Sequence, residues 1–330
     1  MKLPRRRFLQ RAAGAAAFVT GSASLMALSG SGAWSQAART IRLVVPFPPG
    51  GAIDVLARIV AEEVGRLQGP VVVIENRPGA GTEIGTEAVV RATPDGNTLL
   101  MGSDALLTVP LLRQVGYDPL ADLVPICSLA RTPTVIVVNS ESPYRMLDEL
   151  LRAARTRPGE LTYGSAPGSV VNVGFAMLAH AAGIRMTFVP FGGTLPAVNA
   201  LLGGHIDAAM VDYPAAVGQL RAGKLRALAA GSRRRIDGLP AVPTVAESGY
   251  QDYELELWYG PFAPAKTPTD IIVQLAAWFS RAMKAPAIEA KLAMQQISPV
   301  VACGADFAGF LRQRSDEFGR AIRAANIKAE

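Results

Sequence analysis

The turn from Pro46 to Asp54 has the residue types and spacing that suit anion binding. It follows a short apolar run, 41–45, expected to form a strand, and precedes an amphipathic run, 53–67, expected to form a helix. Gly50 and Gly51 therefore lie where the strand gives way to the helix. The first N–H groups of a helix lack acceptors within it, and the positive end of the helix dipole lies there. We expect this turn to bind a carboxylate through its backbone.

Similar small and hydroxyl residues follow other expected strands in both halves of the chain. They are Gly102-Ser103, the loop 164–169 and Gly192-Gly193-Thr194. Each alone is ordinary turn chemistry. Because they recur after successive strands, we expect their N–H and hydroxyl donors to converge on one cleft. Asp54 is expected to cap or orient the first helix, and Asp212 is either a partner for an amino or hydroxyl group of a ligand or a surface charge.

Residues for catalysis are few. The only two histidines, His180 and His205, lie in no cluster with metal-ligand spacing, which excludes a histidine-rich zinc site. The sequence contains no G-x-S-x-G nucleophile motif. A Ser/His/Asp hydrolase would need one of the histidines to reach Ser103 or Ser165, and nothing in the sequence supports that.

A glycine-rich segment, 79–85, invites comparison with dinucleotide-binding loops. Its glycines have the spacing G-x-G-x-x-x-G, one residue longer than the fingerprint. We interpret it as a loop that uses glycine for its backbone conformation, and we expect no cofactor.

The basic charge of the chain lies at its start. The net charge is +6, but residues 1–37 hold five basic residues and no acidic one, which leaves 28 basic against 27 acidic residues. A nearly neutral remainder does not favour a nucleic-acid surface, so no nucleic-acid partner is expected.

Residues 1–37 are expected to form an export signal. Arg5-Arg6-Arg7-Phe8-Leu9 is similar to the twin-arginine pattern, a weakly apolar run follows at 12–28, and Ser35-Gln36-Ala37 offers a cleavage site before Ala38. The alternative is a permanent N-terminal membrane anchor. The remainder is expected to be soluble and periplasmic.

The two cysteines, Cys127 and Cys303, leave their state open. In an exported chain they could pair, but their spacing gives no geometry. Two buried free thiols are the preferred interpretation.

Strands and helices are expected to alternate along the rest of the chain. This pattern predicts parallel sheets with helices on both faces. We expect domain 1 at 38–139 and 258–330 and domain 2 at 140–257, with crossings near 139–143 and 258–264 and a ligand cleft between the domains. The expected strands are 41–45, 71–74, 98–101, 123–130, 134–138, 161–163, 186–189, 206–211 and 225–230, and the expected helices are 53–67, 82–92, 146–156, 170–182, 196–202, 214–221, 271–283, 287–295 and 305–325.

Many ordered motifs match one family. The chain resembles the periplasmic substrate-binding proteins of tripartite tricarboxylate transporters, also called the Bug family, over nearly all of the mature length. The matching segments are Ile41-Arg42-Leu43-Val44-Val45-Pro46-Phe47-Pro48-Pro49-Gly50-Gly51, Glu75-Asn76-Arg77-Pro78-Gly79-Ala80-Gly81, Pro94-Asp95-Gly96, Tyr117-Asp118-Pro119, Pro158-Gly159-Glu160-Leu161, Val189-Pro190-Phe191, Gly223-Lys224-Leu225-Arg226-Ala227-Leu228-Ala229, Leu239-Pro240-Ala241-Val242-Pro243-Thr244 and Trp258-Tyr259-Gly260.

The resemblance implies two doubly wound α/β domains with a hinged cleft, similar to class II periplasmic binding proteins. It implies capture of a small organic carboxylate, delivery to the membrane components of the transporter, no chemistry on the ligand, no cofactor or metal, and a monomer. It places ligand contacts at Phe47, Pro48, Gly50, Gly51, Ser103, Asp104, Ser165, Gly168, Ser169, Phe191, Gly192, Gly193, Thr194 and Asp212.

The sequence departs from the family pattern at two places. Val189-Pro190-Phe191-Gly192-Gly193 stands where the family has Val-Pro-Tyr-Lys-Gly, and Asn172 or a neighbour stands where a histidine is frequent. A less polar second-domain wall favours a monocarboxylate, an aromatic acid or an amide. Two other functions stay open: an exported hydrolase that uses Ser103 or Ser165, and a sensor that presents its ligand state to a signalling partner.

Overall fold

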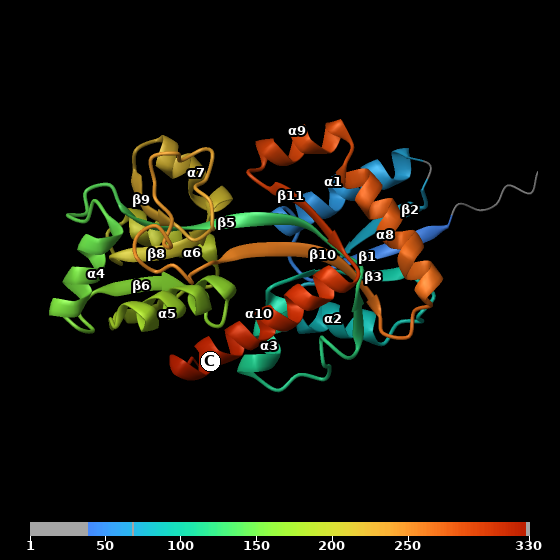
Figure 1. Cartoon of the computed structure of the whole chain (residues 1–330), viewed down its shortest axis with the longest axis horizontal. Helices are drawn as coiled ribbons and strands as arrows, with labels where there is room; N and C mark the ends of the chain where they lie inside the picture. Colours follow the sequence, from blue (N-terminus) through green and yellow to red (C-terminus); the bar gives the residue numbers. More distant parts are fainter. Residues whose placement is uncertain (1–38, 68, 328–330) are drawn as a thin grey trace, which may run out of the picture. The chain divides into compact units, whose positions relative to one another are not determined.

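The computed structural model describes residues 39–67 and 69–327 (Figure 1). The expected export signal and its cleavage site lie outside the described residues. No described helix is long and apolar enough to cross a bilayer. How the described residues divide into domains stays a prediction.

Strands and helices alternate through most of the chain, as the sequence predicts. The helices are α1 (Ala52–Arg66), α2 (Glu83–Val90), α3 (Ala105–Leu112), α4 (Leu147–Thr156), α5 (Val170–Ala182), α6 (Thr194–Leu202), α7 (Tyr213–Arg221), α8 (Thr269–Met283), α9 (Pro286–Met294) and α10 (Ala305–Ala324), with a 3₁₀ turn η1 at Ala80–Thr82. The strands are β1 (Thr40–Val45), β2 (Val71–Asn76), β3 (Thr98–Ser103), β4 (Leu123–Pro125), β5 (Cys127–Asn139), β6 (Thr162–Ser165), β7 (Thr187–Pro190), β8 (Ala208–Asp212), β9 (Leu225–Ala230), β10 (Glu256–Pro264) and β11 (Ser298–Cys303).

The sheets are mixed, which corrects the expectation of parallel sheets. In the first sheet, β2, β1 and β3 are parallel, and β10 joins β3 antiparallel before pairing antiparallel with β5. In the second sheet β8, β6 and β7 are parallel, while β5 lies antiparallel to β8 and to β9. Strand β5 therefore belongs to both sheets: its first half pairs with β10 and β11, and its second half with β8 and β9.

Five elements differ from the sequence prediction. The two strands expected at 123–130 and 134–138 are instead the short β4 and one long β5. Helix α3 and strand β11 were not expected at all, and the segment expected only as a crossing at 258–264 is the ladder strand β10.

Helices cover both faces of the first sheet (Figure 1). On one face, Leu43 of β1 packs in a core with α1, α8 and α9. Its neighbour Val44 points to the other face and packs in a core with α2, α3 and α10, as the alternation of side chains along a strand requires. The side chains of Phe262 and Phe307 flank Trp258 in this second core.

The preferred interpretation of free thiols is wrong, because Cys127 and Cys303 form a disulfide. The bond joins the start of β5 to the end of β11, and these residues are cross-strand partners in the ladder. This register brings two cysteines that are 176 residues apart in sequence into contact, and sequence spacing alone carries no such information.

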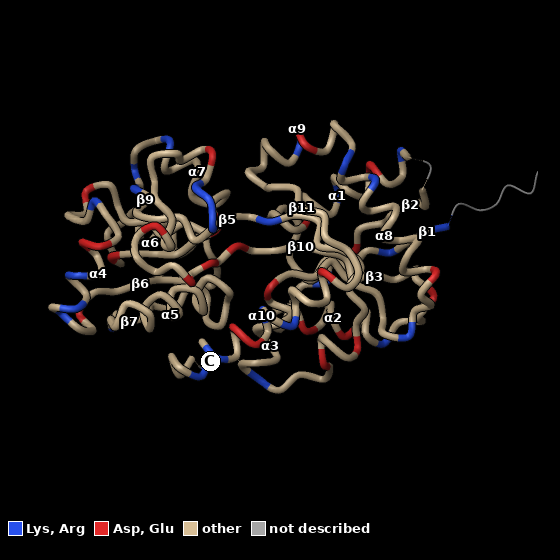
Figure 2. Tube along the Cα trace, in the orientation of Figure 1, with Lys and Arg blue, Asp and Glu red and all other residues tan. Residues whose placement is uncertain are grey.

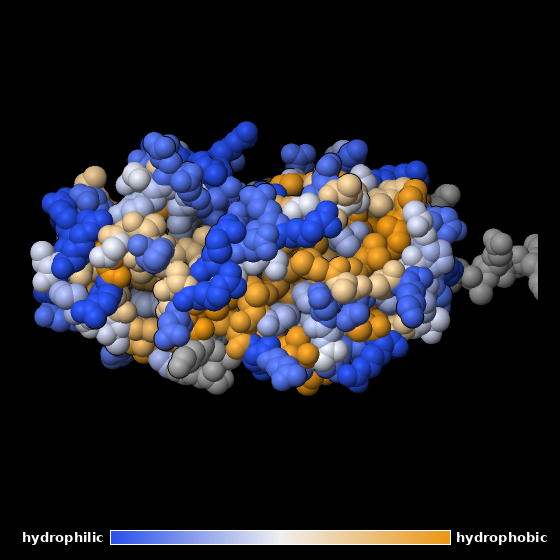
Figure 3. All heavy atoms as spheres, turned by 60° about the horizontal axis from the view of Figure 1, so that its bottom comes forward, coloured by the Kyte–Doolittle hydropathy of each residue, from blue (hydrophilic) through white to orange (hydrophobic). Residues whose placement is uncertain are grey.

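Charged residues of both signs are spread along the described trace (Figure 2). On the face drawn in Figure 3, hydrophilic residues form much of the surface and hydrophobic ones gather mainly in its central and right-hand part.

Candidate ligand-binding pocket

One pocket of about 680 Å³ collects the turns that follow strands in both sheets. It is lined by the β1–α1 turn, the β3–α3 turn, the start of α5, and the turns β7–α6 and β8–α7. Leu257 and Tyr259 of β10 and residues Gln295 and Ile297 of the α9–β11 connection complete the wall. Because the carboxyl ends of parallel strands meet at one edge of a sheet, turns far apart in sequence converge here.

Eleven of the fourteen residues expected to contact a ligand line this pocket. They are Phe47, Pro48, Gly50, Gly51, Ser103, Asp104, Ser169, Gly192, Gly193, Thr194 and Asp212.

The other three, Ser165, Gly168 and Phe191, do not line the pocket. Ser165 is buried at the end of β6, and the ring of Phe191 packs so closely on Gly164 that a Cβ there would lie 2.7 Å from it. Gly168 has a φ of +65° and lies against Leu112. Ligand contact at these three residues stays a prediction.

The N-termini of five helices converge on the pocket. The cap residues of α1, α3, α5, α6 and α7 are Gly51, Asp104, Ser169, Gly193 and Asp212, and each of them lines it. At α1, the first amide bonded within the helix is that of Val55, which donates to the Gly51 carbonyl oxygen. Glycine has no side chain to cap the earlier amides, so the N-termini of α1 and α6 are open to an anion.

The pocket has no basic side chain among its described lining residues. Its ionisable acids are Asp104 and Asp212. Any attraction for an anion therefore comes from backbone amides and helix dipoles rather than from a fixed cation.

Asp54 holds the first turn in place through hydrogen bonds. Its buried carboxylate accepts hydrogen bonds from the Gly50 amide at 2.9 Å, from the Asn76 side chain at 2.8 Å, and from Arg58 at 2.9 and 3.0 Å. The Asn76 amide also donates to the Phe47 carbonyl oxygen at 3.1 Å. Burial raises the pKa of Asp54, but these hydrogen bonds together outweigh burial and hold it below its usual value.

The two glycines of the turn differ in their amides and in their backbone conformation. The Gly50 amide donates to Asp54, which leaves the Gly51 amide as the first donor that the turn could offer to an anion. Only Gly50, with a φ of +91°, needs the left-handed region, while Gly51 has an ordinary extended φ of −76°. Glycine at 51 keeps the helix end open, whereas glycine at 50 permits the backbone bend.

The two pocket acids are both shifted towards their neutral forms. Burial raises the pKa of Asp104 to about 7, although its Oδ2 atom accepts the Trp258 amide at 3.0 Å. Burial also raises the pKa of Asp212, partly offset by the Thr194 hydroxyl and the Ala215 amide. The buried phenol of Tyr259 has a raised pKa, through burial first and then through the nearby Asp212 and Asp104 carboxyls.

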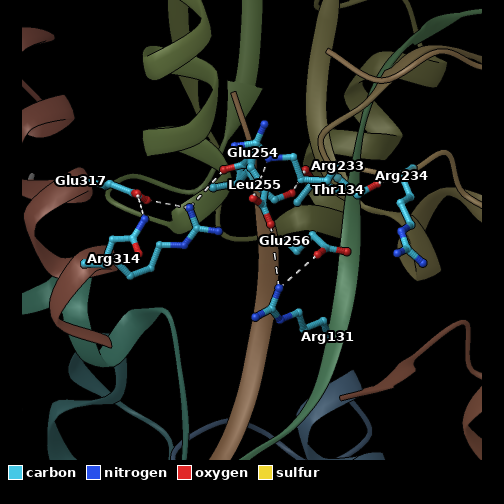
Figure 4. Close-up of polar contacts among 11 residues, drawn as sticks. Arg131, Thr134, Arg233, Arg234, Glu254, Leu255, Glu256, Arg314 and Glu317 are labelled. Atoms are coloured by element: carbon cyan, nitrogen blue, oxygen red, sulfur yellow. Dashed lines mark hydrogen bonds and ion pairs between the residues drawn. The ribbon is translucent and has the colours of Figure 1, made fainter. Parts of the chain in front are cut away.

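A charged network of Arg131, Glu254, Glu256, Arg314 and Glu317 lies around strands β5 and β10 (Figure 4). Arg131 of β5 lies 3.8 Å from Glu254 and 3.6 Å from Glu256, and Arg314 of α10 donates to the Glu254 carbonyl oxygen at 3.1 Å. Side chains alternate along β10, so Leu257 and Tyr259 line the pocket while Glu256 lines a separate cavity with Arg131.

Sequence reasoning missed several lining residues. Tyr259 lies in a segment interpreted only as a crossing, and Leu257 directly precedes that segment, although the aromatic residues there were a usable signal. Gln295 and Ile297 come from the opposite end of the chain, and no local pattern indicated them. No three His, Cys, Asp or Glu side chains gather to hold a metal within residues 39–67 and 69–327.

Residues 56–327 match the model of the tripartite tricarboxylate transporter family receptor. The chain belongs to this receptor family. Protein BugT of Bordetella pertussis is 35% identical over 295 residues, covering 88% of this chain and 90% of BugT.

Two solved structures support this membership of the receptor family. R. palustris Rpa4515 with adipate is 30% identical, with a TM-score of 0.78 over 89% of this chain and 99% of that one. The periplasmic binding protein BugD is also 30% identical, with a TM-score of 0.75 over 88% and 99%. The expected family and the α/β binding-protein fold are thus confirmed.

Proposed function

We propose that the chain is a periplasmic receptor that captures a small organic carboxylate in the described pocket and delivers it to the membrane components of a tripartite tricarboxylate transporter. The observation that carries this proposal is the convergence of five helix N-termini on a pocket without basic lining residues. Membership of the receptor family and the adipate bound to R. palustris Rpa4515 point in the same direction.

A carboxylate fits these helix ends for a physical reason. It accepts several hydrogen bonds at once, and unpaired amides at a helix N-terminus offer them together with the positive end of the dipole. The glycine caps of α1 and α6 come from different sheets. One ligand that bridges them would hold the two sides of the pocket together, which fits the hinged closure that we propose for the two predicted domains.

The proposed contacts comprise the eleven lining residues named above, with Gly51 and Gly193 as the amide seats. Export through a twin-arginine signal at residues 1–37 is part of the same proposal. No described observation favours a serine hydrolase, because the pocket that contains Ser103 and Ser169 has no histidine among its lining residues, and His180 lines a different cavity.

The experiment begins with a thermal-shift screen of organic acids, because a ligand that binds only the folded state raises its melting temperature. Calorimetry then compares the best acid on the wild type and on Gly51→Asp. An Asp at this cap position would offer its own carboxylate to the α1 amides. We expect the affinity to fall at least about tenfold, equivalent to about 1.4 kcal/mol, without loss of the fold.

Met146→Asp is the matched control. Met146 caps α4, is 60% exposed and lies outside the pocket, so the same carboxylate is added at a helix end that touches no ligand. Equal affinity in wild type and Gly51→Asp would refute the seat at α1. A screen in which no acid raises the melting temperature would refute carboxylate capture itself.

A further inference from the structure

Once the amides are assigned to a carboxylate, the charged side chains left in the pocket are both acids. Asp212 lines it from the β8–α7 turn and Asp104 from the β3–α3 turn. They therefore approach from the two different sheets. The pocket thus offers backbone amide donors at one place and carboxyl acceptors at another. A complementary ligand carries an acceptor at one end and a donor at the other.

Asp212 is available to a ligand. It is half-buried, so part of its surface faces the pocket. It holds the cap position of α7, and the Thr194 hydroxyl and the Ala215 amide lie close enough to favour its charged form. A carboxylate has about four acceptor sites, so Asp212 keeps capacity for a donor on a ligand.

Asp104 supplies a second, independent observation. It is only 1% exposed, and its Oδ1 atom has no hydrogen-bond partner among the described residues, although its Oδ2 accepts the Trp258 amide. A buried polar atom without a partner is costly and points to a group that completes it.

The rest of the wall is predominantly apolar or weakly polar. Hydrocarbon surface comes from Phe47, Ile53, Val170, Leu195, Leu257 and Ile297, and the other polar side-chain groups are the Gln295 amide and the hydroxyls of Ser103, Ser169, Thr194 and Tyr259. A second carboxylate on a ligand would meet no basic side chain among these lining residues. Its charged neighbours would be Asp104 and Asp212.

We propose that the ligand carries an N–H donor, an ammonium or an amide, besides its carboxylate, and that Asp212 accepts this donor and so selects such acids over dicarboxylates. The inference rests on the proposed function and deepens it. A carboxylate near Asp212 and Asp104 meets two carboxyl groups and no cation, whereas an ammonium or an amide N–H meets an acceptor.

Selection of this kind is strong, because a site with a polar group rejects a ligand that leaves that group unpaired. The apolar walls favour a hydrocarbon linker between the carboxylate and the donor.

The test uses acids that differ at one end only: hexanoate, 6-aminohexanoate, adipic acid monoamide and adipate, together with the corresponding sets of three, four and five carbons. Dissociation constants are measured by calorimetry on the whole mature chain. In the set of best-fitting length, we expect the amine or the monoamide to bind at least about tenfold more tightly than the dicarboxylate.

Asp212→Asn identifies the side chain responsible. The variant keeps the shape of Asp212 but removes its charge and adds a donor. We expect the preference for the amine over the dicarboxylate to shrink at least about tenfold. Asp207→Asn is the control, because Asp207 lies before the same strand, bonds Thr162 and does not line the pocket.

The outcomes separate the two proposals. If acids bind but the dicarboxylate has the lowest dissociation constant in its set, the inference fails, whereas the proposed carboxylate-binding function is supported. If the amine or monoamide leads and Asp212→Asn keeps the same ranking, Asp212 is not the selecting residue and the inference is overturned. If no acid in any set binds, the proposed function fails. The ranking on the wild type decides the inference even if a variant does not fold.

Discussion

The backbone amide of Gly50 donates a hydrogen bond of 2.9 Å to the Oδ2 atom of Asp54, four residues further on. The same carboxylate accepts the side chains of Arg58 and Asn76, so one buried acid joins the turn, the first helix and the edge strand β2. The bend that presents Gly51 to the pocket is therefore fixed by a residue outside the pocket lining.

We expect Asp54→Ala to destabilise the chain by about 2–3 kcal/mol, because the Gly50 amide and the Asn76 side chain lose their acceptor. Urea denaturation measures the change. The lowered pKa of Asp54 means that its contribution is present above the unfolded value of 3.8 and is lost as the pH falls through the lower folded value. The difference between wild type and variant should thus narrow in acid.

Asp148→Ala is the control for this prediction. Asp148 pairs with Arg152 one helical turn away, but both side chains are more than half exposed. Exposed pairs contribute little, so we expect a change within about 0.5 kcal/mol. A similar loss in both variants would contradict the bracing role of Asp54.

Asp104 should make stability depend on pH in the opposite sense. Its pKa rises from 3.8 to about 7 on folding, through burial. Its contribution is full below 3.8, and between these values the folded chain holds a proton that the unfolded chain has released. Stability then falls as the pH rises, by at most about 1.4 kcal/mol per pH unit.

Asp104→Asn removes this titration while it keeps an oxygen for the Trp258 amide. Urea denaturation measures the free energy of unfolding of both proteins. We expect that of the variant to rise relative to that of the wild type between pH 5 and pH 8. A stability difference independent of pH would show that Asp104 does not titrate in this range.

Reduction should destabilise the chain markedly. The Cys127–Cys303 bond closes a loop of 176 residues, and a loop of this size gives about 5 kcal/mol in chain-entropy estimates. We expect dithiothreitol to lower the melting temperature of the wild type and to leave that of Cys127→Ala/Cys303→Ala unchanged. Equal sensitivity of the two proteins to reductant would argue against the disulfide.

Arg314 should contribute most to stability among the cations of the network in Figure 4. It is 5% exposed, donates to the Glu254 carbonyl oxygen and to Glu317, and lies over the ring of Phe310. We expect Arg314→Met to cost about 2–4 kcal/mol in urea denaturation, because two buried or half-buried acceptors lose their donor. Arg320→Met, at an exposed position of the same helix, should change stability by less than about 0.5 kcal/mol.

Local signals determined how well each element was predicted. Helix α5 was predicted with its observed bounds, because Ser169 caps its start and Gly183 ends it in the left-handed conformation. Helix α3 was missed because its sequence is apolar on all sides and contains Pro110. The prediction left residues 131–133 between two strands, yet β5 runs through them and Pro133 occupies a ladder position opposite Glu256. Strand β11 exists only through its pairing with β5.

The site was predictable as a set of turns and less so as a set of side chains. Strand-to-helix turns can be recognised from sequence, and eleven expected residues lie in the pocket. Within the loop 164–169, however, only the direction of the backbone decides that Ser169 faces the pocket while Ser165 is turned inward. The disulfide and the β10 wall depend on contacts between distant segments, which no local pattern encodes.

The glycine-capped ends of α1 and α6 have a consequence for how this receptor can change over generations. A seat made of backbone amides survives most substitutions, because every non-proline residue carries the same N–H group. Substitutions of the surrounding side chains can therefore change ligand specificity one at a time, while the backbone amides that bind the carboxylate stay in place. The backbone that binds the acid can thus stay constant while the side chains that select the rest of the ligand vary.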